Sequence, residues 1–141
     1  MSKFSAFMAQ NVAKFENKKV VVSNRFKDEN GKPIEWEIRA ISSEESDDIT
    51  RRAMVQVPVA GRRGSYTREM DQVKYTGMLL AASVVFPALD DAELQDSYGA
   101  KTPEELLKKM LYPAEETKLA EEVMSFSNIQ NLGELAEEAK N

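Results

Sequence analysis

The stretch that decides the fold class runs Ile34-Glu35-Trp36-Glu37-Ile38-Arg39-Ala40-Ile41. Apolar and charged side chains alternate in it, and a period of two places one face of a β-strand on a core and the other face in water. Residues 19–26 are a second strand candidate, and the connection contains Asn30 and Gly31, which suit the positive φ angles of a tight turn. We therefore predict an N-terminal β-hairpin.

An isolated two-stranded ribbon is only marginally stable in water, so this hairpin needs a helical layer against its apolar face. The residues expected to make that contact are Val20, Val22, Ile34, Trp36 and Ile38. Each strand would keep an outer edge that another chain could extend. The fold class that follows is α+β, namely a mainly α-helical single domain with one N-terminal β-hairpin.

Helical signals dominate the chain after the hairpin. Ser42 and Glu45 have the spacing of a capping box, which predicts that a helix begins there. A wide apolar stripe predicts a central helix over residues 67–86, with Val73 among the residues that face the core. Shorter helices are expected over residues 90–99, with Asp90 as the cap, and over residues 102–111, with Thr102 as the cap.

Between the first helix and the central helix, residues 55–66 are expected to form a loop, because they contain Pro58 and two glycines. Between those glycines, Arg62 and Arg63 place two guanidinium groups on flexible backbone. The Walker pattern of a phosphate-binding loop is absent. Two alternatives stay open: a solvated loop, or a loop that binds a carboxylate-rich partner through bidentate arginine.

The N-terminal residues 2–15 are predicted to form a short amphipathic helix, because large apolar side chains recur in them at near-helical spacing. Phe4, Phe7 and Met8 are the candidate partner-binding residues of this segment. The helix either covers the domain's own core or forms an arm that docks on another subunit.

We divide the chain into a globular domain over residues 1–112 and an acidic helical segment over residues 113–141. Narrow apolar stripes in the second segment are embedded in glutamates. Leu119, Val123 and Phe126 form the first stripe and are candidate partner-binding residues; the second stripe consists of Leu132, Leu135, Ala136 and Ala139. Such helices are either loosely docked on the domain or wait for a partner.

The composition narrows the classes of function. The 141 residues include no Cys and no His, which removes thiol nucleophiles, imidazole acid–base chemistry, disulfides and the metal sites built on those ligands. Helix capping accounts for the acidic residues Asp90 and Glu93 without a metal ion. Together with the lack of Cys and His, this leads us to expect no catalytic residue, no metal site and no cofactor. Residues 78–86 are too short an apolar run for a membrane-spanning helix, which needs about 20 residues, and residues 1–15 lack the pattern of a signal peptide.

Charge is distributed unevenly along the chain. Residues 1–70 carry 13 basic and 10 acidic side chains, whereas residues 71–141 carry 6 and 14. This asymmetry is typical of a protein that meets a partner with one end, and acidic helices that merely face water explain it equally well. A nucleic-acid contact would use Arg51, Arg52, Arg62, Arg63 and Arg68. We do not expect one, because the chain as a whole is acidic, with a sequence pI of about 4.9, whereas a nucleic-acid-binding face is normally rich in Lys and Arg.

Three stretches together carry a resemblance to a known family: residues 1–11, the hairpin residues 23–36, and residues 92–99. They read Met-Ser-Lys-Phe-Ser-Ala-Phe-Met-Ala-Gln-Asn, Ser-Asn-Arg-Phe-Lys-Asp to Gly-Lys-Pro-Ile-Glu-Trp, and Ala-Glu-Leu-Gln-Asp-Ser-Tyr-Gly. In them the chain resembles the XkdN-like tail assembly chaperones of contractile-tailed phages, PBSX-like prophages and tailocins. The resemblance covers about the first 112 residues, is expected to lapse in the Glu-rich end, and transfers no catalytic residue.

The resemblance implies an assembly factor that binds the tape-measure protein and keeps it soluble while tail-tube subunits polymerise around it. Such a factor acts in the bacterial host cytoplasm and is not expected in the mature particle. The tail-tube protein is a further candidate partner, and self-association is compatible with the same role. A second class stays open, namely a small structural tail or baseplate component whose hairpin edge joins a neighbour's sheet and which is retained in the particle.

Overall fold

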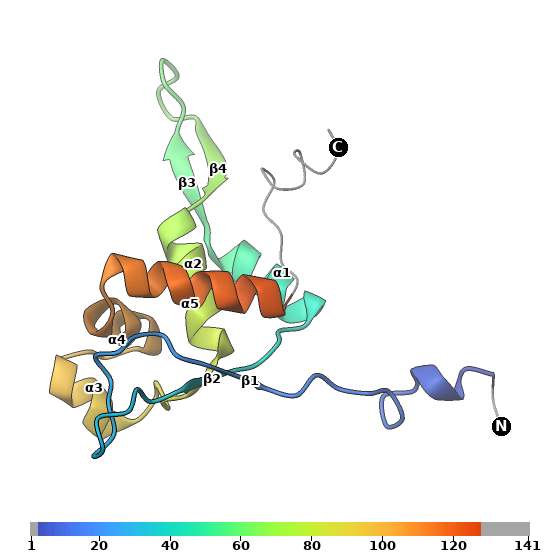
Figure 1. Ribbon diagram of the computed structural model, residues 1–141. Helices are drawn as coiled ribbons and strands as arrows, with labels where there is room; N and C mark the ends of the chain where they lie inside the picture. The colour runs from blue at the N-terminus through green and yellow to red at the C-terminus, as the bar shows by residue number, and fades with distance from the viewer. Residues whose placement is uncertain (1–2, 128–141) are drawn as a thin grey trace, which may run out of the picture.

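The computed structural model describes residues 3–127. Its helices are α1 (Ser43–Arg52), α2 (Gln72–Ser83), α3 (Ala92–Tyr98), α4 (Pro103–Met110) and α5 (Pro113–Phe126). Its strands are β1 (Lys18–Val20), β2 (Trp36–Ile38), β3 (Met54–Pro58), β4 (Tyr66–Met70) and β5 (Val84–Phe86), and a 3-10 helix lies at Ser5–Phe7. In Figure 1, α2 and α5 cross in the middle of a helical body, from which the β3–β4 hairpin and the N-terminal segment project in different directions.

The predicted N-terminal hairpin is present as β1 and β2, with Val20 opposite Trp36. At its turn, Gly31 has a φ of 80°, and its amide donates to the carbonyl oxygen of Asp28 at 3.0 Å. Each strand is three residues long, shorter than predicted, although the pairing resumes next to the turn. The apolar contact with the helices is confirmed, because Val20, Val22, Trp36 and Ile38 are buried and Ile34 is half-buried.

The prediction of a mainly helical domain with one hairpin is wrong in two places. First, β5 pairs with β2, so the sheet has the order β1-β2-β5 and the outer edge of β2 is occupied within the chain. Second, β3 and β4 form a separate antiparallel ribbon where a loop and the start of the central helix were predicted. Pro58 is compatible with this ribbon because it is the last residue of β3, where a missing amide hydrogen removes little pairing.

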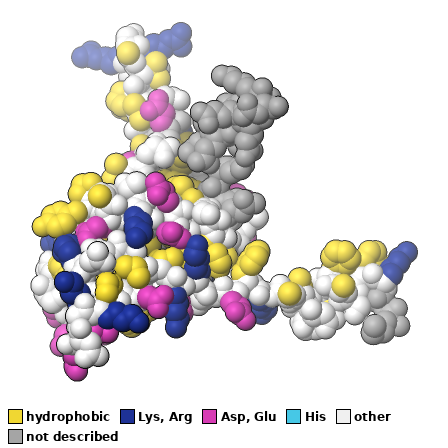
Figure 2. All heavy atoms as spheres, viewed as in Figure 1, with side chains coloured by type: hydrophobic (Ala, Val, Ile, Leu, Met, Phe, Trp, Pro, Cys, Tyr) yellow, Lys and Arg dark blue, Asp and Glu magenta, His cyan; other side chains and the backbone are white. Residues whose placement is uncertain are grey.

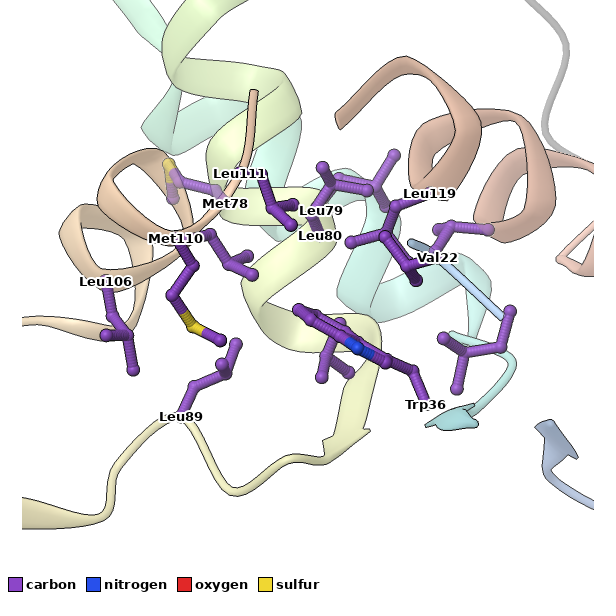
Figure 3. Packing of buried hydrophobic residues seen from close by; sticks show 14 of the residues in the cluster. Val22, Trp36, Met78, Leu79, Leu80, Leu89, Leu106, Met110, Leu111 and Leu119 are labelled. Carbon is purple, nitrogen blue, oxygen red and sulfur yellow. The ribbon is translucent and has the colours of Figure 1, made fainter. Parts of the chain in front are cut away.

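Helix α2 is the centre of the core, as predicted, but it begins at Gln72 and ends at Ser83. Side chains from the sheet and from α4 and α5 surround it (Figure 3). Burial of each large aliphatic side chain contributes about 1.5–3 kcal/mol, so this cluster supplies most of the driving force for folding. The largest side chains without exposed surface include Trp36, Ile38, Leu79, Leu80, Leu106, Leu119 and Val123.

Local capping signals place the helix ends. The hydroxyl of Ser42 accepts from the amide of Glu45 at 3.2 Å, and the Glu45 carboxylate accepts from the amide of Ser42, which confirms the capping box. Thr102 caps α4 in the predicted way, and Gly99 ends α3 with a φ of 67°. The predicted cap of α3 at Asp90 is wrong by one residue, because the side chain of Asp91 accepts from the amide of Leu94 at 2.9 Å.

Ion pairs join the basic first half of the chain to acidic α5. The guanidinium of Arg25 donates to both carboxylate oxygens of Glu115, at 2.8 and 2.6 Å, and lies over the ring of Tyr112. Hydrogen bonding from Arg25 lowers the pKa of Glu115 to about 2. Lys18 pairs with Glu122 at 2.8 Å. Part of the charge asymmetry in the sequence is therefore satisfied inside the molecule.

Candidate partner-binding surface

The N-terminal segment is the most exposed apolar part of the described chain. We define residues 3–17 as the arm. Its predicted amphipathic helix is wrong, because only the short 3-10 helix forms and no side chain caps it. Exposed fractions are 80% for Phe7 and Phe15, 59% for Phe4, 48% for Val12 and 42% for Met8. In Figure 2 hydrophobic side chains gather on the arm beyond the body, and of the two alternatives the exposed fractions favour an arm over a helix that covers the domain's own core.

The arm is ordered locally and is attached at its base. Near its start, the side-chain amide of Asn11 donates to the carbonyl oxygen of Ser5 at 2.9 Å. At its base, the ring of Phe15 lies 6.2 Å from that of Phe126 at the end of α5. Asn17 then donates to the carboxylate of Glu37 on β2 at 3.0 Å. The base of the arm is thus held against the body, while the apolar side chains nearer its start face solvent.

The arm is also basic. Lys3 and Lys14 are its lysines, and no acidic residue occurs before Glu16. Monomeric proteins seldom expose contiguous apolar surface without a partner, so a segment of this kind marks an interaction site. An apolar partner with acidic flanks would complement both features of the arm.

Arg62 and Arg63 lie at the tip of the β3–β4 hairpin rather than in an irregular loop. Two consecutive turns form this tip: the amide of Arg62 donates to the carbonyl of Val59, and that of Ser65 donates to the carbonyl of Arg62. Gly61 and Gly64 occupy the positive-φ positions of these turns. Both arginine side chains are exposed. The tip and the arm do not converge, because they leave the body in different directions (Figure 1).

The three α5 candidates have different surroundings. Leu119 and Val123 are buried in the core and present no surface to a partner in this structure. Phe126 is half-buried against the core and contacts Phe15. The second predicted stripe, Leu132 to Ala139, lies outside the described residues. The division of the chain at residue 112 stays a prediction, while α5 contributes to the core through Leu119 and Val123.

A groove that the sequence reasoning missed lies between α2 and α4, with a volume of about 580 Å³. Its floor includes Val73 and Gly77, and Val73 is 67% exposed although the stripe on α2 placed it in the core. The signal that could have indicated this groove is Gly77, since glycine in the middle of a helix is unfavourable without a reason.

Two absences concern the described residues alone. Residues 3–127 contain no cluster of three or more Asp or Glu side chains arranged to hold a metal ion. None of the helices in that range combines the length and the apolar character that crossing a bilayer requires.

Comparisons with known proteins agree with the resemblance noted in the sequence and extend it. Residues 4–140 match the family described as phage XkdN-like tail assembly chaperone protein. The Bacillus subtilis phage-like element PBSX protein XkdN is 27% identical, over 97% of this chain and 93% of that protein. YqbN of the same organism is also 27% identical, over 97% and 92%. The expectation that similarity lapses after residue 112 is wrong, because the family match continues into the Glu-rich end.

The fold is shared with a solved structure. The crystal structure of the protein YqbN superimposes with a TM-score of 0.74 at 19% sequence identity. The match covers 92% of this chain and 99% of that one.

Proposed function

Since the chain belongs to the phage XkdN-like tail assembly chaperone family, we propose that it binds the tape-measure protein and keeps it soluble while the tail tube assembles. The observation that carries this proposal is the arm, where Phe7 and Phe15 are each 80% exposed. A long helical client exposes apolar stripes until the tube encloses it, and an apolar arm masks such stripes.

The energetics of the arm suit binding that is later reversed. Burial of one aromatic side chain contributes about 1.5–3 kcal/mol before the costs of ordering the arm and the client are subtracted. Phe4, Phe7 and Met8 together therefore support a weak contact, and several chaperone molecules on one client provide the total affinity. Tube subunits that bind the client more tightly displace such contacts one at a time.

The proposal includes the location of the protein. A chaperone of this kind works in the host cytoplasm, contacts the tape-measure protein and meets the tail-tube protein when the client is handed over. It is absent from the finished particle. Exposed Arg62 and Arg63 at the hairpin tip offer a second contact for carboxylates of these partners.

Co-expression with the cognate tape-measure protein tests the role of the arm. The wild-type chain should raise the soluble yield of the client, and Phe4→Ala/Phe7→Ala should reduce that gain, because the arm loses two exposed aromatic side chains. Phe86→Ala is the matched control, since Phe86 is an aromatic residue that is 52% exposed and lies outside both the arm and the β3–β4 tip. Equal yields with the double variant and the wild type would contradict the role of the arm.

Mass spectrometry of purified particles separates the chaperone from the structural tail or baseplate component. The chaperone should be missing from particles, and its deletion should leave cells without tails. The structural alternative joins a hairpin edge to a neighbour's sheet; β5 occupies the outer edge of β2, and β1 is an end strand of the three-stranded sheet. Recovery of the chain from particles at a fixed stoichiometry would favour the structural component.

A further inference from the structure

The groove between α2 and α4 has an apolar floor and charged walls. Val73, Gly77 and Met78 come from α2, and Glu104, Glu105 and Lys108 come from α4, with Arg52 at the end of α1. Val73 is 67% exposed, which is unusual for an apolar residue that continues the stripe on the central helix. Gly77 and Met78 are buried within the molecule, so the apolar surface that the groove leaves uncovered belongs mainly to Val73.

Gly77 on the groove floor has no explanation within the chain. A glycine in the middle of a helix costs about 0.5–1 kcal/mol relative to alanine. A Cβ at position 77 would meet no atom within 4 Å, and the backbone there does not have a positive φ. Neither crowding nor backbone conformation requires glycine at this position. Close approach of another backbone is the remaining physical reason for a glycine on a helix.

The spacing of the lining residues on α2 and α4 suits a third helix. Val73 and Gly77 are four residues apart on α2, and Glu104 and Lys108 are four residues apart on α4. Rows of side chains at i and i+4 form the ridges between which a ridge of another helix packs. An added helix in this groove would contact both α2 and α4, with its closest approach at Gly77.

The charges at the rim define the orientation and chemistry of such a helix. The α1–α2 side carries Arg52 and Lys74, whereas the α4 side begins with Glu104 and Glu105. Lys108 is already paired with Glu116 at 2.8 Å. Within residues 3–127, the side chains of Lys74 and Glu104 form no hydrogen bond or ion pair. The occupant should therefore have a carboxylate on one flank and a basic group on the other.

We propose that the α2/α4 groove holds one amphipathic helix of the tape-measure protein, with a glycine, alanine or serine over Gly77. A carboxylate of that helix faces Lys74, and a lysine or arginine faces Glu104. This assignment rests on the proposed function and adds the chemistry of the client segment. The groove recognises a helix, whereas the arm covers apolar surface with little regard to its sequence.

The test measures binding of the full-length chain to overlapping peptides that span the cognate tape-measure protein. Gly77→Phe fills the groove and should weaken the best peptide by about tenfold or more, as expected for a change at the centre of an interface. Val73→Asp should act in the same direction through the floor. Gln72→Phe is the matched control, because Gln72 is exposed on the same helix and does not line the groove.

The outcomes separate this inference from the proposed function. Loss of binding in Gly77→Phe and Val73→Asp, with Gln72→Phe unchanged and all three variants folded by circular dichroism, supports the groove. If Gly77→Phe does not fold, Val73→Asp alone decides, since Val73 is largely exposed. Wild-type affinity in both groove variants overturns the groove and leaves the chaperone function intact. If the wild-type chain binds neither the peptides nor the intact client, the proposed function fails and the groove proposal fails with it.

Discussion

The arm and helix α5 have similar apolar patterns and opposite surroundings. Phe7 in the arm is 80% exposed, whereas Leu119 in α5 has no exposed surface. Both were candidates for partner binding, because each stripe is short and lies among polar residues. The comparison shows that a short apolar stripe identifies side chains that favour burial. Whether the chain itself buries them depends on contacts from segments elsewhere in the sequence.

Leu119 of α5 is buried and Phe7 of the arm is exposed because the two segments make different contacts, both with near neighbours and with distant parts of the chain. Helix α5 begins with Pro113 at its first turn, and the carboxylate of Glu115 accepts from the amide of Tyr112 at 2.8 Å. Arg25 then binds Glu115 from the other half of the chain. The short 3-10 helix of the arm has neither a side-chain cap nor a distant ion pair, and helices of one turn are unstable alone.

The largest expected effect is on the free energy of unfolding when the two stripes are truncated in parallel. Leu119→Ala should cost about 2–5 kcal/mol, because it leaves a cavity in the core. Phe7→Ala should change the free energy of unfolding by less than about 0.5 kcal/mol, as surface substitutions do. Urea denaturation followed by circular dichroism measures both. Equal losses of unfolding free energy in the two variants would mean that the arm packs on the body in solution. The difference between the arm and α5 would then not hold.

A smaller effect should appear in the pH dependence of stability. Arg25 holds the pKa of Glu115 at about 2, below its ordinary value of 4.5. Because the pKa is lower in the folded state, the ionised carboxylate stabilises the fold above about pH 4.5, and this contribution is lost as the pH falls toward 2. Glu115→Gln should therefore destabilise the protein at pH 7 and make less difference near pH 2.5.

Urea midpoints of wild type and Glu115→Gln at the two pH values provide the measurement. The pair Arg39–Glu45, in which the pKa of Glu45 is also about 2, is present in both proteins and cancels in the comparison. A difference between the proteins that is independent of pH would mean that Glu115 stabilises α5 without its charge.

The smallest expected effect is on stability when Phe15, at the base of the arm, is truncated. It tests whether Phe15 attaches the arm to the body. Phe15 belongs to the arm but contacts Phe126, and aromatic pairs of this kind contribute about 0.5–1.5 kcal/mol. Phe15→Ala should lower stability slightly, at the lower end of that range because the ring is largely exposed. Hydrogen exchange at the end of α5 should become faster in this variant and should not change in Phe7→Ala. Identical exchange in both variants would show that the ring pair does not fasten the arm.

The sequence predicted much of the fold and less of the partner-binding surface. The Trp36 hairpin, the box at Ser42 and the cap at Thr102 were all identified, because each depends on residues close together in the chain. The β3–β4 ribbon was missed because Pro58 and the two glycines looked like a loop, although alternation in Met54–Pro58 was available as a signal. Val73 was assigned to the core because it continues the stripe on α2.

What the sequence by itself determined are the turns, caps and strand faces, since their hydrogen bonds and side-chain periods involve near neighbours. Gly31 at its positive φ and Gly99 at the end of α3 belong to this group. Only the tertiary structure decided that β5 covers the edge of β2, that Leu119 is buried and that the arm is exposed. Burial depends on which distant segments meet, and a helical or alternating pattern is the same whether its apolar face meets its own core or another protein.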